Sequence, residues 1–246
     1  MIAATIVGLP ALAALACVAV VYIGAVMQAA TGVGVGILSS PVLLLVDPDF
    51  IPACVVVAVL PLSFSVAIAD RSHIDRRGVT AALVGRVPGL VLGAVVVAAI
   101  SDDTLAILVG TTVLAGVVVS LTAKRFTPTT PALVAAGFGS GFTGTAVGVG
   151  GPPIAMTYQH SDAVTMRATI SLFFSVGSVL TAIALMIAGE LGTRQWQLIA
   201  LLMPSILLGL ATARRHKELL VGSAVRPVVL GLSAFSATAL LIRTAI

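Results

Sequence analysis

Charged residues are scarce in this chain, and their scarcity excludes a soluble fold. Only 9% of the 246 residues are Asp, Glu, Lys or Arg, whereas 59% are apolar. Soluble domains carry roughly 25% charged residues, and a soluble chain of this length could not hide so much apolar surface from water. A bilayer tolerates an apolar exterior. The composition therefore predicts an integral membrane protein in contact with lipid.

Carboxylates are missing from the middle of every apolar segment, since all nine Asp and Glu residues lie in loops or near segment ends. Ionisable groups inside a membrane mark cation and proton pathways, and acid–base enzymes need positioned carboxylates or histidines. The three histidines and two cysteines show no metal-ligand spacing. We therefore expect neither an enzyme nor a cation transporter, and no catalytic residue, metal or cofactor.

Nucleic acid is also excluded as a partner, although the net charge is +4. The basic residues form short clusters between apolar runs, which is the pattern of cytoplasmic membrane loops. Three such clusters are Arg71, Arg76 and Arg77, then Lys124 and Arg125, then Arg214, Arg215 and Lys217. The other loops are acidic or mixed, with Asp47, Asp49, Asp102, Asp103 and Glu190. The clusters predict that 70–78, 124–130 and 214–222 lie inside.

Long apolar runs dominate the chain, and a membrane helix needs about 20 apolar residues. Two shorter apolar pieces, 34–46 and 152–159, each follow a glycine-rich stretch. We predict that each forms a hairpin with the apolar run before it, because the loop orientation requires 131–159 to enter and leave on one side. The predicted hairpins are 3–46 and 131–159, and the predicted spans are 51–69, 79–100, 104–123, 165–188, 196–213 and 224–244.

The two halves of the chain read as repeats of opposite orientation. The first hairpin starts and ends outside, and the second starts and ends inside. The sequence TGVGVG at 31–36 matches TAVGVG at 145–150, and Pro88 and Gly93 match Pro204 and Gly209. We therefore predict an all-α integral membrane protein with two inverted repeats, residues 1–125 and 126–246. Each repeat contains a glycine-rich broken-helix hairpin and three transmembrane helices. Inverted repeats with interrupted helices are typical of transporters.

The glycine stretches of the hairpins supply the candidate substrate site. A helix that begins inside the membrane presents unpaired N–H groups and a partial positive charge, which suit an anion. Close helix packing through small residues is the alternative interpretation. The candidate substrate-binding residues are Thr31, Gly32, Gly34, Gly36, Ser39, Ser40, Pro41, Thr145, Gly148, Gly150, Gly151, Pro152 and Pro153, together with Arg86.

Arg86 is the one basic residue that lies well inside a predicted span, next to Pro88. Either it contributes to the anion site, or its side chain reaches along the helix to the membrane surface. Gly85, Gly89 and Gly93 on the same span form two GxxxG steps, which favour close packing of a neighbouring helix. Residues 139–144 match GxGxxG, but no βαβ unit surrounds them, so they predict no dinucleotide site.

Three segments resemble the sulfite exporter TauE/SafE family of membrane transporters. They are TGVGVGILSSPV at 31–42, GTAVGVGGPPIAMTY at 144–158 and RATI at 167–170. The first departs from the family's usual glycine triplet, because Val35 lies between Gly34 and Gly36. The resemblance covers essentially the whole chain and implies transport of sulfite or of another sulfur-containing or organic anion.

We therefore expect a secondary transporter or facilitator for a small anion, bound between the two hairpin tips and moved by alternating access. The expected location is the bacterial inner membrane, with both termini outside. The sequence leaves open whether the protein is a homo-oligomer. An anion channel of the same architecture and a structural membrane subunit are the alternatives.

The predicted topology can be tested by cysteine accessibility labelling. Single cysteines placed in 124–130 and in 214–222 should react from the same side of the membrane, because both loops are basic. Labelling of the two loops from opposite sides would contradict the inverted repeat.

Overall fold

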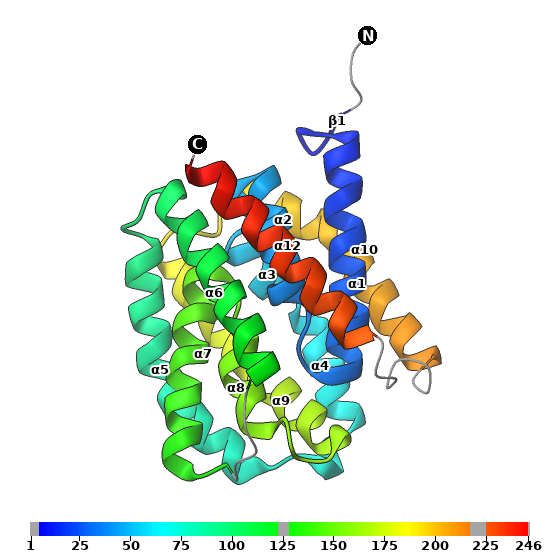
Figure 1. The fold of residues 1–246 in the computed structure, drawn as a ribbon, viewed down its shortest axis with the longest axis vertical. Helices are drawn as coiled ribbons and strands as arrows, with labels where there is room; N and C mark the ends of the chain where they lie inside the picture. The colour runs from blue at the N-terminus through cyan, green and yellow to red at the C-terminus, as the bar shows by residue number, and fades with distance from the viewer. Residues whose placement is uncertain (1–4, 123–127, 217–224, 246) are drawn as a thin grey trace.

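The chain folds into a bundle of helices, most of which run along its long axis (Figure 1). The computed structural model describes residues 5–122, 128–216 and 225–245. Within these residues, six segments are long and apolar enough to cross a membrane. They are α1 (Ala11–Thr31), Pro48–Ala69, α5 (Arg76–Val97), α6 (Asp102–Thr122), α9 (Ala163–Ile187) and α10 (Thr193–Arg215). The all-α membrane class expected from the sequence is confirmed.

The remaining helices are shorter or begin beside residues outside the described ranges. They are α2 (Val35–Val46), α7 (Thr130–Val147), α8 (Gly151–Tyr158) and α12 (Val225–Ala245). The predicted boundary between residues 125 and 126 lies outside the described residues, as do Lys124, Arg125 and Lys217.

The sequence predicts that the first hairpin begins at residue 3, but residues 5–10 are not helical. Strands β1 (Thr5–Ile6) and β2 (Leu9–Pro10) pair antiparallel, and the helix begins only at Ala11. Val7 and Gly8, between the strands, both have positive φ, as a tight two-residue hairpin turn requires. Pro10 then has extended backbone angles and precedes the first helical residue.

The predicted span 51–69 is interrupted rather than continuous. It contains α3 (Ala53–Ala58) and α4 (Leu60–Ala69), and the 3-10 helix η1 (Pro48–Phe50) comes just before it. Pro61 lies in the first turn of α4. Because proline has no N–H, the hydrogen bond that would continue the helix back to Val57 is missing. The apolar pattern did not reveal this break, since every residue around it is apolar.

Two glycines in the left-handed conformation end the helices that lead into the breaks. Gly32 follows α1 with φ of 92°, and Gly148 follows α7 with φ of 73°. A residue with a Cβ is strained at such angles, so glycine is the usual residue at this position. The next helices, α2 and α8, have 12 and 8 residues, which is too short to cross a membrane.

Ion pairs tie the chain together at both ends of the bundle. At the end that holds β1 and the last turn of α12, Arg194 contacts Asp47 at 2.6 Å and Asp49 at 3.7 Å (Figure 1). We name this the acidic end. At the opposite end, Arg167 contacts Asp70 at 2.7 Å, beside the 3-10 helix η2 (Arg71–His73) and the start of α5. We name this the basic end.

Glycines bring α5 and α7 into direct backbone contact. A Cβ added to Gly85 would lie 1.9 Å from the Val134 carbonyl oxygen, and one added to Gly89 would lie 2.1 Å from the Phe138 carbonyl oxygen. On α7, a Cβ added to Gly137 would lie 1.9 Å from the Ala82 carbonyl oxygen. No side chain fits at these three contacts, so the backbones of α5 and α7 pack directly against each other there.

Gly89→Ala is therefore expected to lower the thermal stability and the purified yield. Its methyl group would meet backbone rather than a movable side chain, and overpacking of this kind costs about 1–3 kcal/mol or more. Gly231→Ala in α12 is the matched control, because nothing lies within 4 Å of its added Cβ. Thermal unfolding in detergent should separate the two variants. Equal stability of both would contradict a packing role for Gly89.

Candidate functional site

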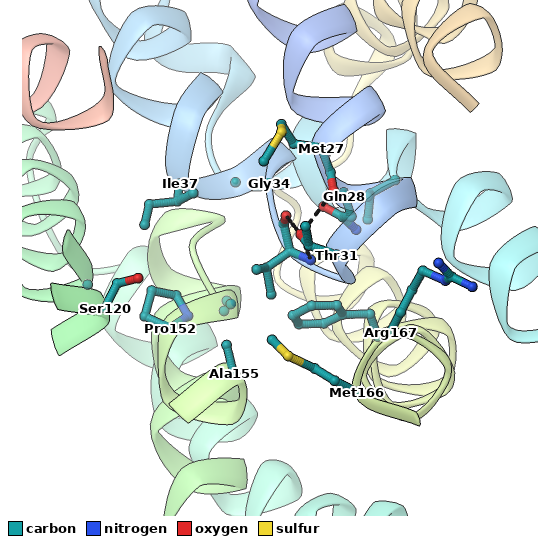
Figure 2. Close-up of a pocket in the computed structure, with 18 of the residues that line it drawn as sticks. Met27, Gln28, Thr31, Gly34, Ile37, Ser120, Pro152, Ala155, Met166 and Arg167 are labelled. Carbon is teal, nitrogen blue, oxygen red and sulfur yellow. Dashed lines mark hydrogen bonds between the residues drawn. The ribbon is translucent and has the colours of Figure 1, made fainter. Parts of the chain in front are cut away.

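A cavity of about 620 Å³ lies between the two helix breaks. Its walls come from the tip of α1 and α2, from α3, from α8 and from the later part of α6 (Figure 2). It also reaches Gln159 and the first turn of α9, where Ala163 and Arg167 line it. Because α9 starts at the basic end, the cavity extends from the breaks toward that end.

The cavity is mainly apolar, with a few polar groups and no carboxylate among its described lining residues. Met27, Val33, Ile37, Met166 and Phe174 supply apolar surface. The polar side chains are those of Gln28, Thr31, Ser120, Gln159 and Ser178, and the two cations are Arg86 and Arg167. A cavity with cations and without carboxylates favours a negatively charged occupant.

The two arginines differ in their partners. Arg167 forms its ion pair with Asp70 and points away from the middle of the cavity (Figure 2). The ion pair holds Arg167 against Asp70 near the start of α9. Arg86 forms no ion pair with any described Asp or Glu residue. Among the described residues that line the cavity, the positive charge outside an ion pair is therefore that of Arg86.

The guanidinium of Arg86 lies deep in the protein, with only 2% of the residue exposed. Its two terminal nitrogens donate to Ser140 Oγ and Thr181 Oγ1, each at 3.4 Å. The ring of Phe173 lies 4.8 Å from Cζ, in the geometry of a cation–π contact. Nε has no hydrogen-bond partner. Arg86 therefore does not reach the membrane surface, which was one of the two interpretations of the sequence.

Gly177 on α9 makes room for this guanidinium. A Cβ added to Gly177 would lie 2.0 Å from Nε, 2.3 Å from Cζ and 2.6 Å from Cδ of Arg86. The end of the arginine side chain therefore lies directly against the backbone of α9. Phe173 and Thr181 stand one turn before and one turn after Gly177, so α9 holds the guanidinium along a single face.

Ser140 connects Arg86 to the start of α8. The Ser140 hydroxyl donates to the Gly150 carbonyl oxygen at 2.6 Å and also accepts from Arg86. The first N–H groups of a helix have no helical partner. In α8 two of these positions are Pro152 and Pro153, which carry no N–H. The available donors at this helix start are therefore the N–H groups of Gly150 and Gly151.

The start of α2 is capped differently. The Val35 N–H donates to Gln28 Oε1 at 3.1 Å, and the Gln28 amide donates to Ser63 at 3.3 Å. Gln28 thus uses one of the donors that the sequence had assigned to an anion. A Cβ added to Gly36 would lie 2.3 Å from the Gly148 carbonyl oxygen. The two breaks are therefore in direct contact, and a carbonyl oxygen lies against the first turn of α2.

The structure brings together only part of the candidate site. The predicted residues that line the cavity are Thr31, Gly34, Gly36, Arg86, Gly148, Gly150, Gly151 and Pro152. The others, Gly32, Ser39, Ser40, Pro41, Thr145 and Pro153, are not among its lining residues. Pro41 is inside α2 and not in its first turn, because the helix begins at Val35.

Buried contacts account for three of these residues. Ser39 donates to the Val20 carbonyl oxygen at 3.4 Å, and the hydroxyl oxygens of Thr145 and Thr181 are 3.1 Å apart. Gly32 holds the left-handed end of α1. Their roles in the described structure are therefore to support the helices around the cavity.

Sequence reasoning did not select Ser140, Phe173, Gly177 or Thr181, all of which surround Arg86. A signal was present for the three residues on α9, because positions 173, 177 and 181 follow the four-residue spacing of one helix face. Nothing in the sequence indicated that this face meets Arg86. That contact depends on how α5, α7 and α9 pack together.

Toward the acidic end the cavity is closed. Val35, Leu38, Val147 and Val149 surround the breaks and are at most 1% exposed, and they belong to one continuous apolar core. The described structure therefore has a cavity at the breaks that extends toward the basic end, with buried apolar side chains around the breaks.

Comparison with known proteins agrees with the resemblance found in the sequence. The model of the family described as "Sulfite exporter TauE/SafE" matches residues 16–240, which is nearly the whole chain. No curated protein matches the chain. No solved structure matches it. By the extent of the family match, the chain belongs to the sulfite exporter TauE/SafE family of membrane transporters.

Proposed function

We propose that this protein is a secondary transporter for a small anion, such as sulfite or an organosulfur or organic anion, and that the anion binds to Arg86 beside the start of α8. The observation that carries the proposal is a buried guanidinium that no described Asp or Glu residue pairs with, at the wall of a cavity between two broken helices. The family match supports anion transport in general.

The energetic argument rests on the cost of burying charge. An unpaired ion away from water loses several kcal/mol of hydration, by order of magnitude. The ring of Phe173 offsets about 2 kcal/mol of this cost when a cation–π contact is desolvated. The hydroxyls of Ser140 and Thr181 are neutral acceptors and bring no negative charge. An anion that enters the cavity would supply the missing countercharge and replace its own hydration with the N–H groups of Arg86.

The start of α8 would add to this binding. A helix N-terminus carries about half a unit of positive charge, and the N–H groups of Gly150 and Gly151 are its available donors. Two positive groups from different parts of the fold, the guanidinium on α5 and the helix start of α8, would then meet one anion. Separation of α5 from α8 would release it.

The closed acidic end favours alternating access over an open channel. In the described conformation the cavity opens toward the basic end, and the basic loop at Arg71, Arg76 and Arg77 marks the cytoplasmic side by the charge rule. We therefore infer an inward-facing state of a protein in the bacterial inner membrane. Relative movement of the two halves would open the acidic end.

Arg86→Leu is expected to reduce sulfite transport at least 30-fold, because removal of one partner of a buried charge pair costs about 2–5 kcal/mol. Arg86→Lys keeps the charge but loses the planar arrangement of donors, so it should retain more activity than the Leu variant. The measurement is uptake of sulfite into proteoliposomes, normalised to the amount of inserted protein. Normal transport by the Leu variant would contradict the proposal.

Gly177→Ala tests whether α9 positions the guanidinium. Its methyl group would displace Arg86, so we expect lower thermal stability and a higher KM for sulfite. In an Arg86→Leu background the same methyl group meets no guanidinium, and its effect on stability should largely disappear. The difference between the two backgrounds should exceed about 0.5 kcal/mol, as contacting residues do. Additive effects of the two substitutions would show that Gly177 does not position Arg86.

A further inference from the structure

Gly144 on α7 lies where the two proposed anion-binding groups come closest to each other. A Cβ added to Gly144 would lie 3.7 Å from Arg86 Nη2 and 3.6 Å from the Gly150 nitrogen. Both nitrogens are therefore within 4 Å of a single point. Gly144, Arg86 and Gly150 all line the cavity, so this point lies at the wall of the proposed site.

Arg86 gives this wall a donor that needs a ligand. The guanidinium has five N–H groups, and the described residues accept two hydrogen bonds from it. Nε has no hydrogen-bond partner among the described residues, but it packs against the α9 backbone at Gly177, so the proposed site depends on the donors of the two terminal nitrogens. The residue itself is only 2% exposed, so its contact with bulk water is small. Beside the start of α8, the Arg86 guanidinium therefore has N–H groups that could donate hydrogen bonds to an anion.

We propose that Gly144 determines the size of the anionic group that binds, because its bare Cα leaves an oxyanion access to both Arg86 Nη2 and the Gly150 N–H. This inference rests on the proposed function and adds a residue that limits the substrate. The groups that fit are small oxyanions, such as sulfite or the sulfonate or carboxylate end of an organic anion. A methyl group at residue 144 would cover both donors.

A methyl group at residue 144 overlaps no backbone atom and requires the Gly150 backbone to shift by only a few tenths of an ångström. The nearest atom to an added Cβ at Gly144 is the Gly150 Cα, at 3.3 Å, and the two nitrogens are at ordinary contact distances. Gly85, Gly89 and Gly137 differ, since an added Cβ there would overlap backbone. Gly144→Ala can therefore test a role in binding without an overlap of backbone atoms. The same substitution at Gly85, Gly89 or Gly137 could not, because the added methyl group would overlap backbone there.

The experiment compares Gly144→Ala with Gly139→Ala. Gly139 is on the same helix, and an added Cβ there would lie 3.5 Å from Pro153, while Gly139 is not among the residues that line the cavity. Both variants gain the same helix propensity. The full-length proteins are reconstituted in liposomes, and sulfite transport is measured as KM and maximal rate. Thermal stability is measured in detergent with and without sulfite.

We expect Gly144→Ala to raise the KM for sulfite at least tenfold and to lose the stabilisation that sulfite binding gives, while its stability without sulfite stays at the level of the wild type. Gly139→Ala should behave as the wild type in every measurement. A wild-type KM in Gly144→Ala would overturn the proposal, and so would loss of stability without sulfite, which would show that Gly144 is a packing residue.

Arg86→Leu, measured in parallel, distinguishes this failure from failure of the proposed function. If Arg86→Leu is inactive while Gly144→Ala is normal, the anion binds at Arg86 but away from Gly144. If both variants transport sulfite as the wild type does, the anion site itself is wrong, and the inference about Gly144 is wrong with it.

Discussion

A buried positive charge that has no carboxylate partner in the described part of the chain is the constraint on which the rest of the proposed site depends. Arg86 is placed among the hydroxyls of Ser140 and Thr181 and the ring of Phe173, none of which cancels its charge. In a membrane protein such a group is costly and is usually functional. These groups stabilise the buried guanidinium in part. Because they do not neutralise its charge, the guanidinium could attract an anion, as we propose.

The surrounding packing follows from the need to hold this side chain in one place. Gly85 and Gly89 set α5 against α7 without intervening side chains, and Gly177 lets the guanidinium lie on the backbone of α9. Three helices thereby fix a long and flexible side chain. Preorganised donors lose little conformational entropy when a ligand binds. The many glycines of these helices therefore serve the site through helix packing as well as through the breaks.

The helix breaks place the ends of helices, with their unpaired backbone groups, inside the protein. Gly32 and Gly148 end their helices in the left-handed conformation, and the next helices start close to each other. At the first break Gln28 satisfies the Val35 N–H, whereas at the second the prolines leave Gly150 and Gly151 as the donors. The two breaks look similar in sequence, but the second one is next to Arg86, and it is the one that we propose to take part in anion binding.

The sequence alone determined the class of protein and much of its secondary structure. Scarce charge and long apolar runs specify a membrane bundle, and the glycine motifs at 31–36 and 145–150 contain the residues at which α1 and α7 end. These features are local, because composition and backbone conformation depend on residues close together in the chain. Breaks that depend on a single proline, such as the one before α4, and the short strands before α1 were not predicted, since apolar residues surround both.

Tertiary structure decided which polar groups meet. Arg86, Ser140, Gly144 and Gly177 belong to three helices, and no periodicity along the chain links them. The role of Arg86 was open in the sequence between a surface anchor and a site residue, because a long side chain can extend in either direction. The packing of α5 against α7 and α9 directs it inward, and the physical reason is steric. The absence of a side chain at Gly177 leaves room for the guanidinium against the backbone of α9.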